Sequence, residues 1–402
     1  MDTMNTAAAD ASSDTSPDTS PDTRFAALAT PAALLDRQRL QRNINRLQQR
    51  MAALGVRLRP HVKTSKSWPV VQAQLAAGAQ GITVSTLKEA AMFAAQGVTD
   101  ITYAVGIAST KLPQVLALRR QGVALKILTD NASAAQAIAD FGRAQGEAFE
   151  VLIEIDTDGH RSGIPPEAPE LLAVGRALHQ GGMVLTGVLT HAGGSYACNT
   201  TEALQAIAEQ ERAGCVRAAE RLRQAGLPCP VVSVGSTPTA LSALQLTGVT
   251  EVRAGVYVFF DLVMCNVGVC TQDDVALSVL TTVTGHQRDK GWALVDAGWM
   301  ALSRDRGTQD QAIDYGYGQV CDVQGVPLPG CIVSGVNQEH GIVSFGATPG
   351  DAAGLDIAAR LPVGTLLRIL PNHACATAAQ FGSYQVLDSA GPPTEWPRFN
   401  GW

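Results

Sequence analysis

A lysine closes one of the first strand-like runs of the chain. Residues 59–63 read RPHVK and lead into Thr64-Ser65-Lys66. In a parallel α/β barrel the carboxyl ends of the strands carry the active site, so Lys63 lies where an amine nucleophile would act. Arg59 and Lys66 add positive charge on either side of it. The alternative is a solvated surface lysine, and the position at a strand end favours the nucleophile.

Two further loops carry groups that suit a phosphate. Residues 234–239 (VGSTPT) follow a strand-like run and open a helix, where hydroxyls and backbone N–H groups gather at the positive helix end. The same letters describe an ordinary N-cap serine with a proline in the first turn. Residues 253–257 (RAGVY) close the next strand-like run and add a cation and more N–H groups. Together the two loops favour phosphate binding.

An imidazole and a thiol stand two residues apart near the end of the chain. Residues 371–375 read PNHAC, so an extended backbone would point His373 and Cys375 to one face. A thiolate with an imidazole suits zinc, and two protein ligands leave positions open for water or substrate. The alternative is a buried cysteine beside an unrelated histidine.

Two other segments have weaker signals. Glu339-His340-Gly341 could supply a general base or form a turn. Residues 303–307 (SRDRG) could recognise a carboxylate through Arg304 and Arg306, or form a solvated loop. The sequence alone favours the turn and the solvated loop.

The strands and helices that must position these residues are expected between residues 30 and 265, where they alternate along the chain. Short apolar runs are separated by amphipathic segments, which is typical of repeated β-α units. An open doubly wound sheet would show the same alternation, and eight or so strands favour an N-terminal (β/α)8 TIM-type barrel. The helix expected over residues 36–54 has Leu40, Ile44, Leu47 and Met51 at spacings of three and four. The predicted strands are 33–35, 57–62, 81–85, 100–105, 123–129, 149–156, 184–190, 231–234 and 249–253.

Beyond residue 265 the runs become short, β-rich and separated by Gly and Pro, which predicts a mostly β C-terminal domain. Residues 1–23 are rich in Ala, Ser, Thr, Asp and Pro and repeat the letters DTSP, so we expect a disordered tail. The predicted organisation is a tail over 1–23, a barrel over 24–265 and a β-rich domain over 266–402 that carries the metal pair.

Composition restricts the class of protein. A formal net charge of −6 argues against nucleic acid or an anionic membrane as partner and favours a small molecule. The eight cysteines are scattered, and we see no secretory leader, so we expect a reducing cytoplasm. No apolar run reaches the ~18 residues of a membrane span.

These motifs resemble the alanine-racemase-like, fold-type III pyridoxal-phosphate (PLP) enzymes, and within them the D-serine dehydratase and D-threonine aldolase group, which includes D-threo-3-hydroxyaspartate dehydratases. The likeness runs from about Thr30 to Leu387 in ordered matches across both domains. The matching segments are RPHVK at 59–63, DGHRSG at 158–163, THAGGSY at 190–196, GST at 235–237, RAGVY at 253–257, DAG at 296–298, EHG at 339–341 and PNHAC at 371–375.

The resemblance implies a (β/α)8 barrel with a C-terminal β domain, PLP joined to Lys63, and a homodimer. It places His191 against the pyridine ring and Arg161 near the phenolic edge of the cofactor. Arg253 would face the pyridine nitrogen, where an arginine keeps that nitrogen unprotonated and weakens the electron sink. The phosphate would be held by the Gly235 loop with Ser236, Thr237, Gly255 and Val256, together with Tyr196.

The His-x-Cys pair separates the reactions of this group, because the resemblance links it to D-serine dehydratases and His-x-Asp to D-threonine aldolases. We therefore expect a dehydratase in which Lys63 removes the Cα proton of a D-3-hydroxy amino acid. Zinc, or another divalent metal, on His373 and Cys375 would assist departure of the 3-hydroxyl. D-Serine would give pyruvate and D-threo-3-hydroxyaspartate would give oxaloacetate, each with ammonia, and D-threonine is a further candidate.

Two alternatives remain open from the sequence. A retro-aldol lyase of the same fold would release glycine and an aldehyde. A non-catalytic PLP-binding protein would hold the cofactor without turnover, although a second domain carrying a metal-like pair argues against it.

Overall fold

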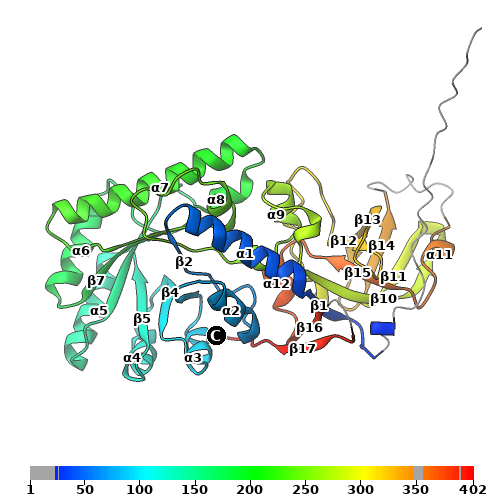
Figure 1. The fold of residues 1–402 in the computed structure, drawn as a ribbon, viewed down its shortest axis with the longest axis horizontal. Coiled ribbons are helices and arrows are strands. Elements are labelled where there is room, and N and C mark those ends of the chain that lie inside the picture. Colours follow the sequence, from blue (N-terminus) through cyan, green and yellow to red (C-terminus); the bar gives the residue numbers. More distant parts are fainter. Residues whose placement is uncertain (1–22, 26, 347–355, 389–390) are drawn as a thin grey trace, which may run out of the picture.

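The computed structural model describes residues 23–25, 27–346, 356–388 and 391–402. The tail expected over residues 1–23 therefore lies almost wholly outside the described residues. The chain forms two parts, a barrel with surrounding helices and a strand-rich domain beside it (Figure 1).

Eight parallel strands form the barrel, in the order β2-β9-β8-β7-β6-β5-β4-β3. A bridge between His61 and Thr83 links the two ends of this order, so the strand pairings form a ring. The (β/α)8 prediction is confirmed. The strands are β2 (Arg57–Leu58), β3 (Ile82–Val84), β4 (Asp100–Gly106), β5 (Ala124–Thr129), β6 (Glu150–Ile155), β7 (Val184–Thr190), β8 (Val231–Val234) and β9 (Glu251–Val252).

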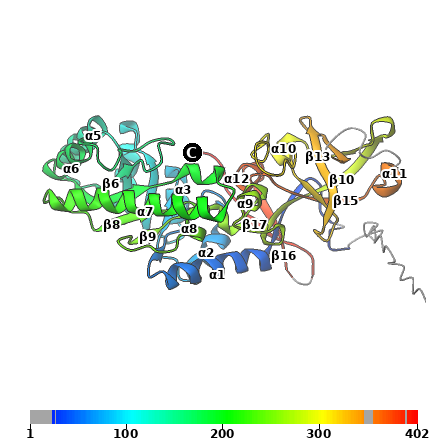
Figure 2. The ribbon, with the colours of Figure 1, turned by 90° about the horizontal axis from the view of Figure 1, so that it is seen from above.

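Helices cover the outside of the barrel (Figures 1 and 2). The first of them, α1 (Arg37–Ala53), buries Leu40, Ile44, Leu47 and Met51, and Asp36 caps it by accepting from the backbone N–H of Arg39. This confirms the predicted periodicity. The others are α2 (Trp68–Ala76), α3 (Leu87–Ala94), α4 (Leu112–Arg120), α5 (Ala132–Gln145), α6 (Glu170–Gln180), α7 (Thr201–Gln224) and α8 (Thr237–Ser242). The next helix, α9 (Leu262–Val267), lies on the side of the barrel that faces the second domain.

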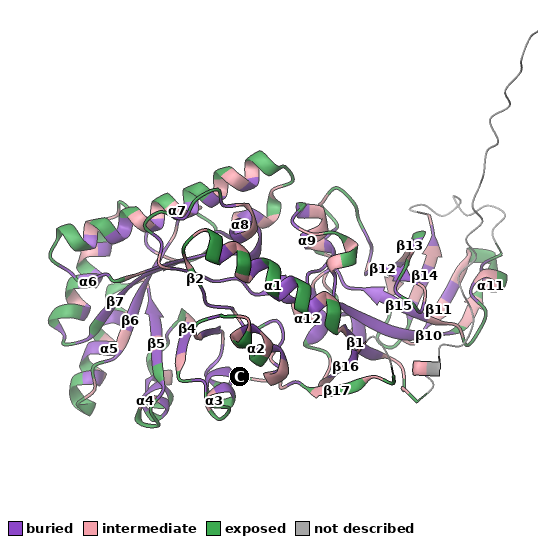
Figure 3. Cartoon of the chain, in the orientation of Figure 1, coloured by how far each residue is buried: buried purple, intermediate pink, exposed green. Residues whose placement is uncertain are grey.

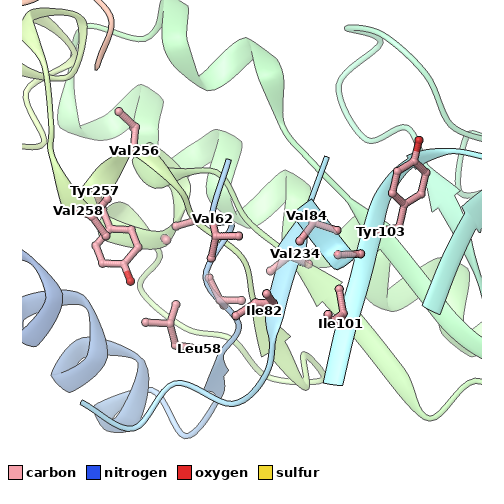
Figure 4. Packing of buried hydrophobic residues seen from close by; sticks show 14 of the residues in the cluster. Leu58, Val62, Ile82, Val84, Ile101, Tyr103, Val234, Val256, Tyr257 and Val258 are labelled. Carbon is pink, nitrogen blue, oxygen red and sulfur yellow. The ribbon is translucent and has the colours of Figure 1, made fainter. Parts of the chain in front are cut away.

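The layer between the barrel strands and the surrounding helices is closely packed. Leu58, Ile82, Ile101 and Val234 come from four strands and belong to one buried apolar cluster (Figure 4). All four side chains are buried, and burial of this kind contributes on the order of 1.5–3 kcal/mol per large aliphatic side chain. Close packing of this type holds the strand ends, and the side chains that follow them, in fixed positions.

One predicted barrel strand lies elsewhere. The run over residues 33–35 does form a strand, β1 (Ala32–Asp36), but it pairs antiparallel with β10 and parallel with β16 in the C-terminal sheet. A short apolar run carries no information about its partner, so its place in the sequence suggested the barrel. The chain passes through the second domain before it enters the barrel.

The C-terminal domain is a nine-stranded sheet in the order β11-β14-β13-β12-β15-β10-β1-β16-β17, and β10 also pairs with β11. Val283, Val295, Val333 and Ile369 belong to its own apolar core. The mostly β prediction is confirmed. The strands are β10 (Leu277–Gln287), β11 (Trp292–Val295), β12 (Gln319–Cys321), β13 (Pro327–Val336), β14 (Gly341–Phe345), β15 (Leu366–Leu370), β16 (Ser383–Leu387) and β17 (Thr394–Pro397).

Short helices complete the two parts. In both views α9 and α12 lie between the barrel and the sheet (Figures 1 and 2). The short α-helices of the second part are α10 (Trp299–Leu302), α11 (Ile357–Arg360) and α12 (Ala374–Ala378). The 3-10 turns are Thr23–Phe25, Ser109–Lys111, Gly193–Ala197, Val256–Val258, Gln272–Asp274 and Arg288–Lys290.

Burial follows the layers. The barrel strands are largely buried, whereas the surrounding helices have a buried inner face and an exposed outer face (Figure 3). Within the described ranges, no helix combines the length and apolarity that crossing a membrane requires.

Candidate active site

One large cavity lies at the carboxyl ends of the barrel strands and has a volume of about 930 Å³. His191 directly follows β7, Gly235 follows β8 and Arg253 follows β9. The barrel brings these strand ends together, as expected of a parallel barrel. The structure gathers every sequence-predicted site residue around this cavity: Lys63, Arg161, His191, Tyr196, Gly235, Ser236, Thr237, Arg253, Gly255, Val256, His373 and Cys375.

Lys63 stands in the cavity on the segment that follows β2. Backbone bonds from His61 N to Ala254 O at 2.8 Å and from Val62 N to Thr83 O at 2.9 Å fix this segment against the neighbouring chain. The flanking cations are engaged with carboxylates. Arg59 lies buried between Glu251 at 2.9 Å and Asp100 at 2.8 Å, and Lys66 contacts Glu89 at 3.3 Å. Because both cations are paired with carboxylates, they contribute less positive charge at Lys63 than their positions in the sequence suggested.

His61 is a cavity residue that the sequence analysis did not select. Burial, followed by the positive charge of Lys63, holds the pKa of His61 well below its usual range, so the imidazole is neutral. Its position two residues before Lys63 is a signal that would have found it, because alternate residues of an extended segment share a face.

The loop after β8 contains a helix N-cap and also the hydroxyl and N–H groups that would hold a phosphate. Ser236 caps α8 by accepting from Thr239 N, and its hydroxyl lies 2.9 Å from that of Ser195. The buried carboxylate of Glu211 accepts from Ala192 N at 2.8 Å and from Gly235 N at 3.1 Å. Glu211, which the sequence analysis missed, thus holds the loops after β7 and β8 together.

Two glycines let backbone approach backbone at this loop. Gly235 has a φ of +128°, and a Cβ there would lie 2.3 Å from Arg253 O. A Cβ on Gly255 would meet His61 O at 3.0 Å. Larger residues would push these strand exits apart and close the space beside Ser236 and Thr237.

Arg253 offers a buried donor to the cavity. Its Nη1 donates to Ser233 Oγ at 3.0 Å and its Nη2 to Thr190 O at 2.6 Å. Its Nε is buried and has no hydrogen-bond partner within the described part of the chain. A buried N–H of this kind needs an acceptor, and the unprotonated nitrogen of a pyridine ring is one. Together with the hydroxyls of Ser236 and Thr237, which line the same cavity, this donor fits PLP.

His191 borders the same space. Its Nδ1 bonds to Gly235 O at 3.1 Å, and its ring lies 6.2 Å from that of Tyr196. Burial lowers the pKa of His191 to about 3, so the ring is neutral and Nδ1 carries the donated proton. Burial likewise raises the pKa of Tyr196, which keeps its phenol protonated. A neutral imidazole is suited to packing against an aromatic cofactor.

The His373–Cys375 pair faces the cavity from the C-terminal domain. The backbone is extended at His373 but turns into α12 at Ala374, so the pair is not the fully extended segment that the spacing suggested. The Cys375 sulfur lies 3.1 Å from the hydroxyl of Thr64. This hydrogen bond joins the residue that follows Lys63 to the candidate metal ligand, across the two domains.

Charge within the pair favours a thiolate. Burial alone would raise the pKa of Cys375, but the hydrogen bond and charge of His373 outweigh it, and the net shift is downward. Burial opposes protonation of His373, yet Asp305 and Cys375 raise its pKa to about 11. Before a metal binds, the pair is therefore an imidazolium beside a thiolate, and metal binding would displace the proton.

Asp305 orients His373 and was not identified as its partner from the sequence. His373 Nδ1 donates to Asp305 Oδ2 at 2.7 Å, which leaves Nε2 as the nitrogen available to a metal. Asn372 donates to Asp305 O at 3.1 Å and fixes this loop. The described residues contain no cluster of three or more His, Cys, Asp or Glu arranged for a metal. A metal here would have two protein ligands and open positions.

The other charged candidates lie outside the cavity. Arg304 covers the ring of Trp299, and Arg306 pairs with Asp314 at 2.7 Å, so neither reaches the site. Glu339 and His340 lie exposed in the turn between β13 and β14. Glu339 and His340 thus belong to a turn. Residues 303–307 are more than a solvated loop, because Asp305 and Gly307 line the cavity although Arg304 and Arg306 do not.

Comparison with known proteins places this site in a family. The alanine racemase N-terminal domain matches residues 35–263, and a putative serine dehydratase domain matches residues 276–387. A D-threo-3-hydroxyaspartate dehydratase from Delftia sp. HT23 is 69% identical over 376 residues, which is 93% of this chain and 98% of the relative. Its solved structure superposes with a TM-score of 0.92 over 94% of this chain and 99% of that one.

More distant relatives share the same two-domain organisation. A D-serine dehydratase from Dictyostelium discoideum is 28% identical over 382 residues, which is 90% of this chain and 94% of the relative. The crystal structure of a D-threonine aldolase from Filomicrobium marinum has a TM-score of 0.77 at 25% identity and covers 92% of this chain and 95% of that one. The chain belongs to the family in which an alanine racemase-type N-terminal domain is joined to a serine dehydratase domain.

Proposed function

We propose that this protein is a PLP- and zinc-dependent dehydratase that converts D-threo-3-hydroxyaspartate to oxaloacetate and ammonia, with D-serine as a second substrate. One observation carries the proposal: Lys63 and the His373–Cys375 pair line the same cavity and are connected through the 3.1 Å contact between Thr64 and Cys375. The 69% identity to the Delftia dehydratase supports the choice of substrate.

The cofactor would be held by residues from four strand ends. When bound, PLP withdraws electrons from the Cα of the amino acid joined to it. Arg253 Nε would donate to the ring nitrogen and leave that nitrogen without a proton. The full set that we assign to the cofactor is Lys63, Arg161, His191, Tyr196, Gly235, Ser236, Thr237, Arg253, Gly255 and Val256.

Lys63 has the second role of base. Its Nζ, once free of the cofactor, takes the Cα proton of the substrate. His61 lies next to it as a neutral imidazole, so it adds no positive charge where that proton is received. A base on one face of the site would take the Cα proton of one enantiomer only, and the relatives support the D enantiomer.

His373 and Cys375 would hold zinc. When bound, the ion acts as a Lewis acid toward the 3-hydroxyl of the substrate and assists its departure. Asp305 keeps His373 Nε2 free for this purpose. A solved structure of a cysteine-to-alanine variant of a D-threo-3-hydroxyaspartate dehydratase is described as the metal-free form, which supports a metal in that relative.

Product analysis tests the proposal. The purified protein, loaded with PLP and zinc, is incubated with D-threo-3-hydroxyaspartate, D-serine and D-threonine, and ammonia, 2-oxo acid and glycine are measured. We expect ammonia and oxaloacetate in equal amounts from the first substrate, and none from a Lys63→Ala variant. Glycine in place of ammonia would establish the aldolase alternative, and an absence of all products would leave a non-catalytic PLP-binding protein.

A substitution at the metal pair separates elimination from retro-aldol cleavage. Cys375→Asp should lose elimination and change zinc content, because the soft thiolate ligand is replaced by a hard carboxylate. Unchanged elimination with unchanged zinc would show that His373 and Cys375 do not form the site.

We also propose that the protein is a homodimer in the cytoplasm, on the basis of the family resemblance and the scattered cysteines. Light scattering on a sizing column tests the dimer, because a monomeric mass would contradict it.

A further inference from the structure

Two cysteines lie in contact at the carboxyl end of α9, outside the residues assigned to the reaction. The sulfur atoms of Cys265 and Cys270 are 3.6 Å apart, and both side chains are half-buried. The other cysteines make no sulfur–sulfur contact of this kind in the ranges that the structure describes.

The local backbone explains this contact. Gly268, with a φ of +87°, ends α9 in the left-handed conformation, and its N–H donates to Cys265 O at 3.0 Å. Val269 N donates to Met264 O at 3.2 Å, which completes a Schellman-type turn. The turn folds the chain back so that Cys270 returns alongside Cys265.

The helix that carries this pair forms part of the cavity wall. Met264 and Asn266, on either side of Cys265, line the cavity. Asn266 donates to Ile313 O at 2.8 Å and so ties α9 to the loop at the cavity mouth. A displacement at Cys265 therefore moves two cavity residues.

The other end of α9 is bonded to the segment that carries the metal pair. Leu262 N donates to Pro371 O at 3.1 Å and Val263 N to Asn372 O at 3.2 Å. The Asp261 carboxylate accepts from Ala374 N at 2.9 Å. A change in α9 is thus transmitted directly to the residues around His373.

We propose that Cys265 and Cys270 form an oxidation site, at which a hydroperoxide produces an intramolecular disulfide that shifts α9 and lowers turnover. The sulfurs must approach by about 1.5 Å to reach a bond of about 2.05 Å, and this movement distorts the turn around Gly268. The proposal goes beyond the dehydratase reaction, and only its effect on turnover rests on that reaction.

The chemistry balances with hydrogen peroxide as the oxidant. The Cys265 thiolate attacks one peroxide oxygen, the O–O bond breaks, and the hydroxide released takes a proton to become water. The Cys270 sulfur then attacks the resulting sulfenic acid, the S–O bond breaks and a second water leaves. The same balance holds whichever of the two sulfurs attacks first, because the atoms exchanged are identical.

Peptide mapping of the whole protein, loaded with PLP and zinc, tests the site. After treatment with hydrogen peroxide and alkylation of free thiols, we expect a peptide containing Cys265 and Cys270 that has lost two hydrogen atoms. Turnover should fall and return on addition of dithiothreitol. A Cys198→Ser variant, which changes another half-buried cysteine, should form the same disulfide.

The Cys270→Ser variant should keep its turnover under the same peroxide treatment, and Cys265→Ser serves as a second variant if the first does not fold. An absence of the cross-link in the mapped native protein would overturn the proposal. So would a cross-link that leaves turnover unchanged, or an equal loss of turnover in Cys270→Ser. The mapping does not depend on the reaction, so its failure is distinguishable from failure of the dehydratase proposal.

Discussion

The carboxylate of Asp305 should control the affinity of the site for zinc. Its Oδ2 accepts from His373 Nδ1 at 2.7 Å, and its Oδ1 accepts from Gly307 N at 2.7 Å. An amide presents only one oxygen, so Asp305→Asn cannot satisfy both donors. It also removes the negative charge that favours a strongly donating imidazole. His373 would then lose its fixed orientation toward the metal.

The size of the effect follows from the exposure of the pair. Loss of a carboxylate behind a ligating histidine commonly costs about 10–100-fold in metal affinity. The His373 side chain is 44% exposed and that of Asp305 is 29% exposed, so solvent screens the interaction. We therefore expect the lower end, about tenfold, which corresponds to about 1.4 kcal/mol.

Competition with a chromophoric zinc chelator measures this affinity directly on the PLP-loaded protein. Asp310→Asn is the matched control, because Asp310 lines the same cavity from the same loop, whereas the hydrogen bond of His373 Nδ1 goes to Asp305. The control should bind zinc as tightly as the native protein. Equal zinc affinity in Asp305→Asn and the native protein would refute the assigned role of Asp305.

Three further predictions concern other buried contacts. The pKa of His191 is about 3 in the folded protein and about 6.5 in the unfolded chain. As the pH falls through this window, the unfolded state binds a proton before the folded state does. The free energy of unfolding therefore decreases. In His191→Gln, the thermal midpoint of the cofactor-free protein should fall less steeply between about pH 6.5 and 4, and an identical slope would contradict this. Glu211→Leu leaves two buried N–H groups unpaired and should weaken PLP binding by about tenfold or more. Glu211→Gln keeps an acceptor and should keep much of the PLP affinity. Fluorescence titration with PLP measures both affinities. Thr64→Val removes the hydroxyl that lies 3.1 Å from the Cys375 sulfur. The variant should bind zinc more weakly by about 0.5–1.5 kcal/mol and should bind PLP as tightly as the native protein. An unaltered zinc titration would count against that contact.

Features that depend on contiguous residues could be predicted from the amino-acid sequence. The spacing of Leu40, Ile44, Leu47 and Met51 predicted α1, because the periodicity of a helix lies within one segment. Residues 59–63 and 235–237 predicted cavity residues because each motif follows a barrel strand, and parallel strands in a barrel end on one rim. Residues 371–375 follow a strand of the second domain, so their prediction depended on the types and spacing of His373 and Cys375.

Pairing between residues far apart in the sequence could be seen only in the folded protein. The partner of β1 is β10, more than 200 residues away, and nothing within residues 32–36 indicates which sheet they join. The same holds for Asp305 with His373 and for Thr64 with Cys375, which are separated by 68 and 311 positions. The Thr64–Cys375 contact arises where the barrel meets the second domain, and the other two form within the second domain. Propensity and periodicity report only on near neighbours in the sequence.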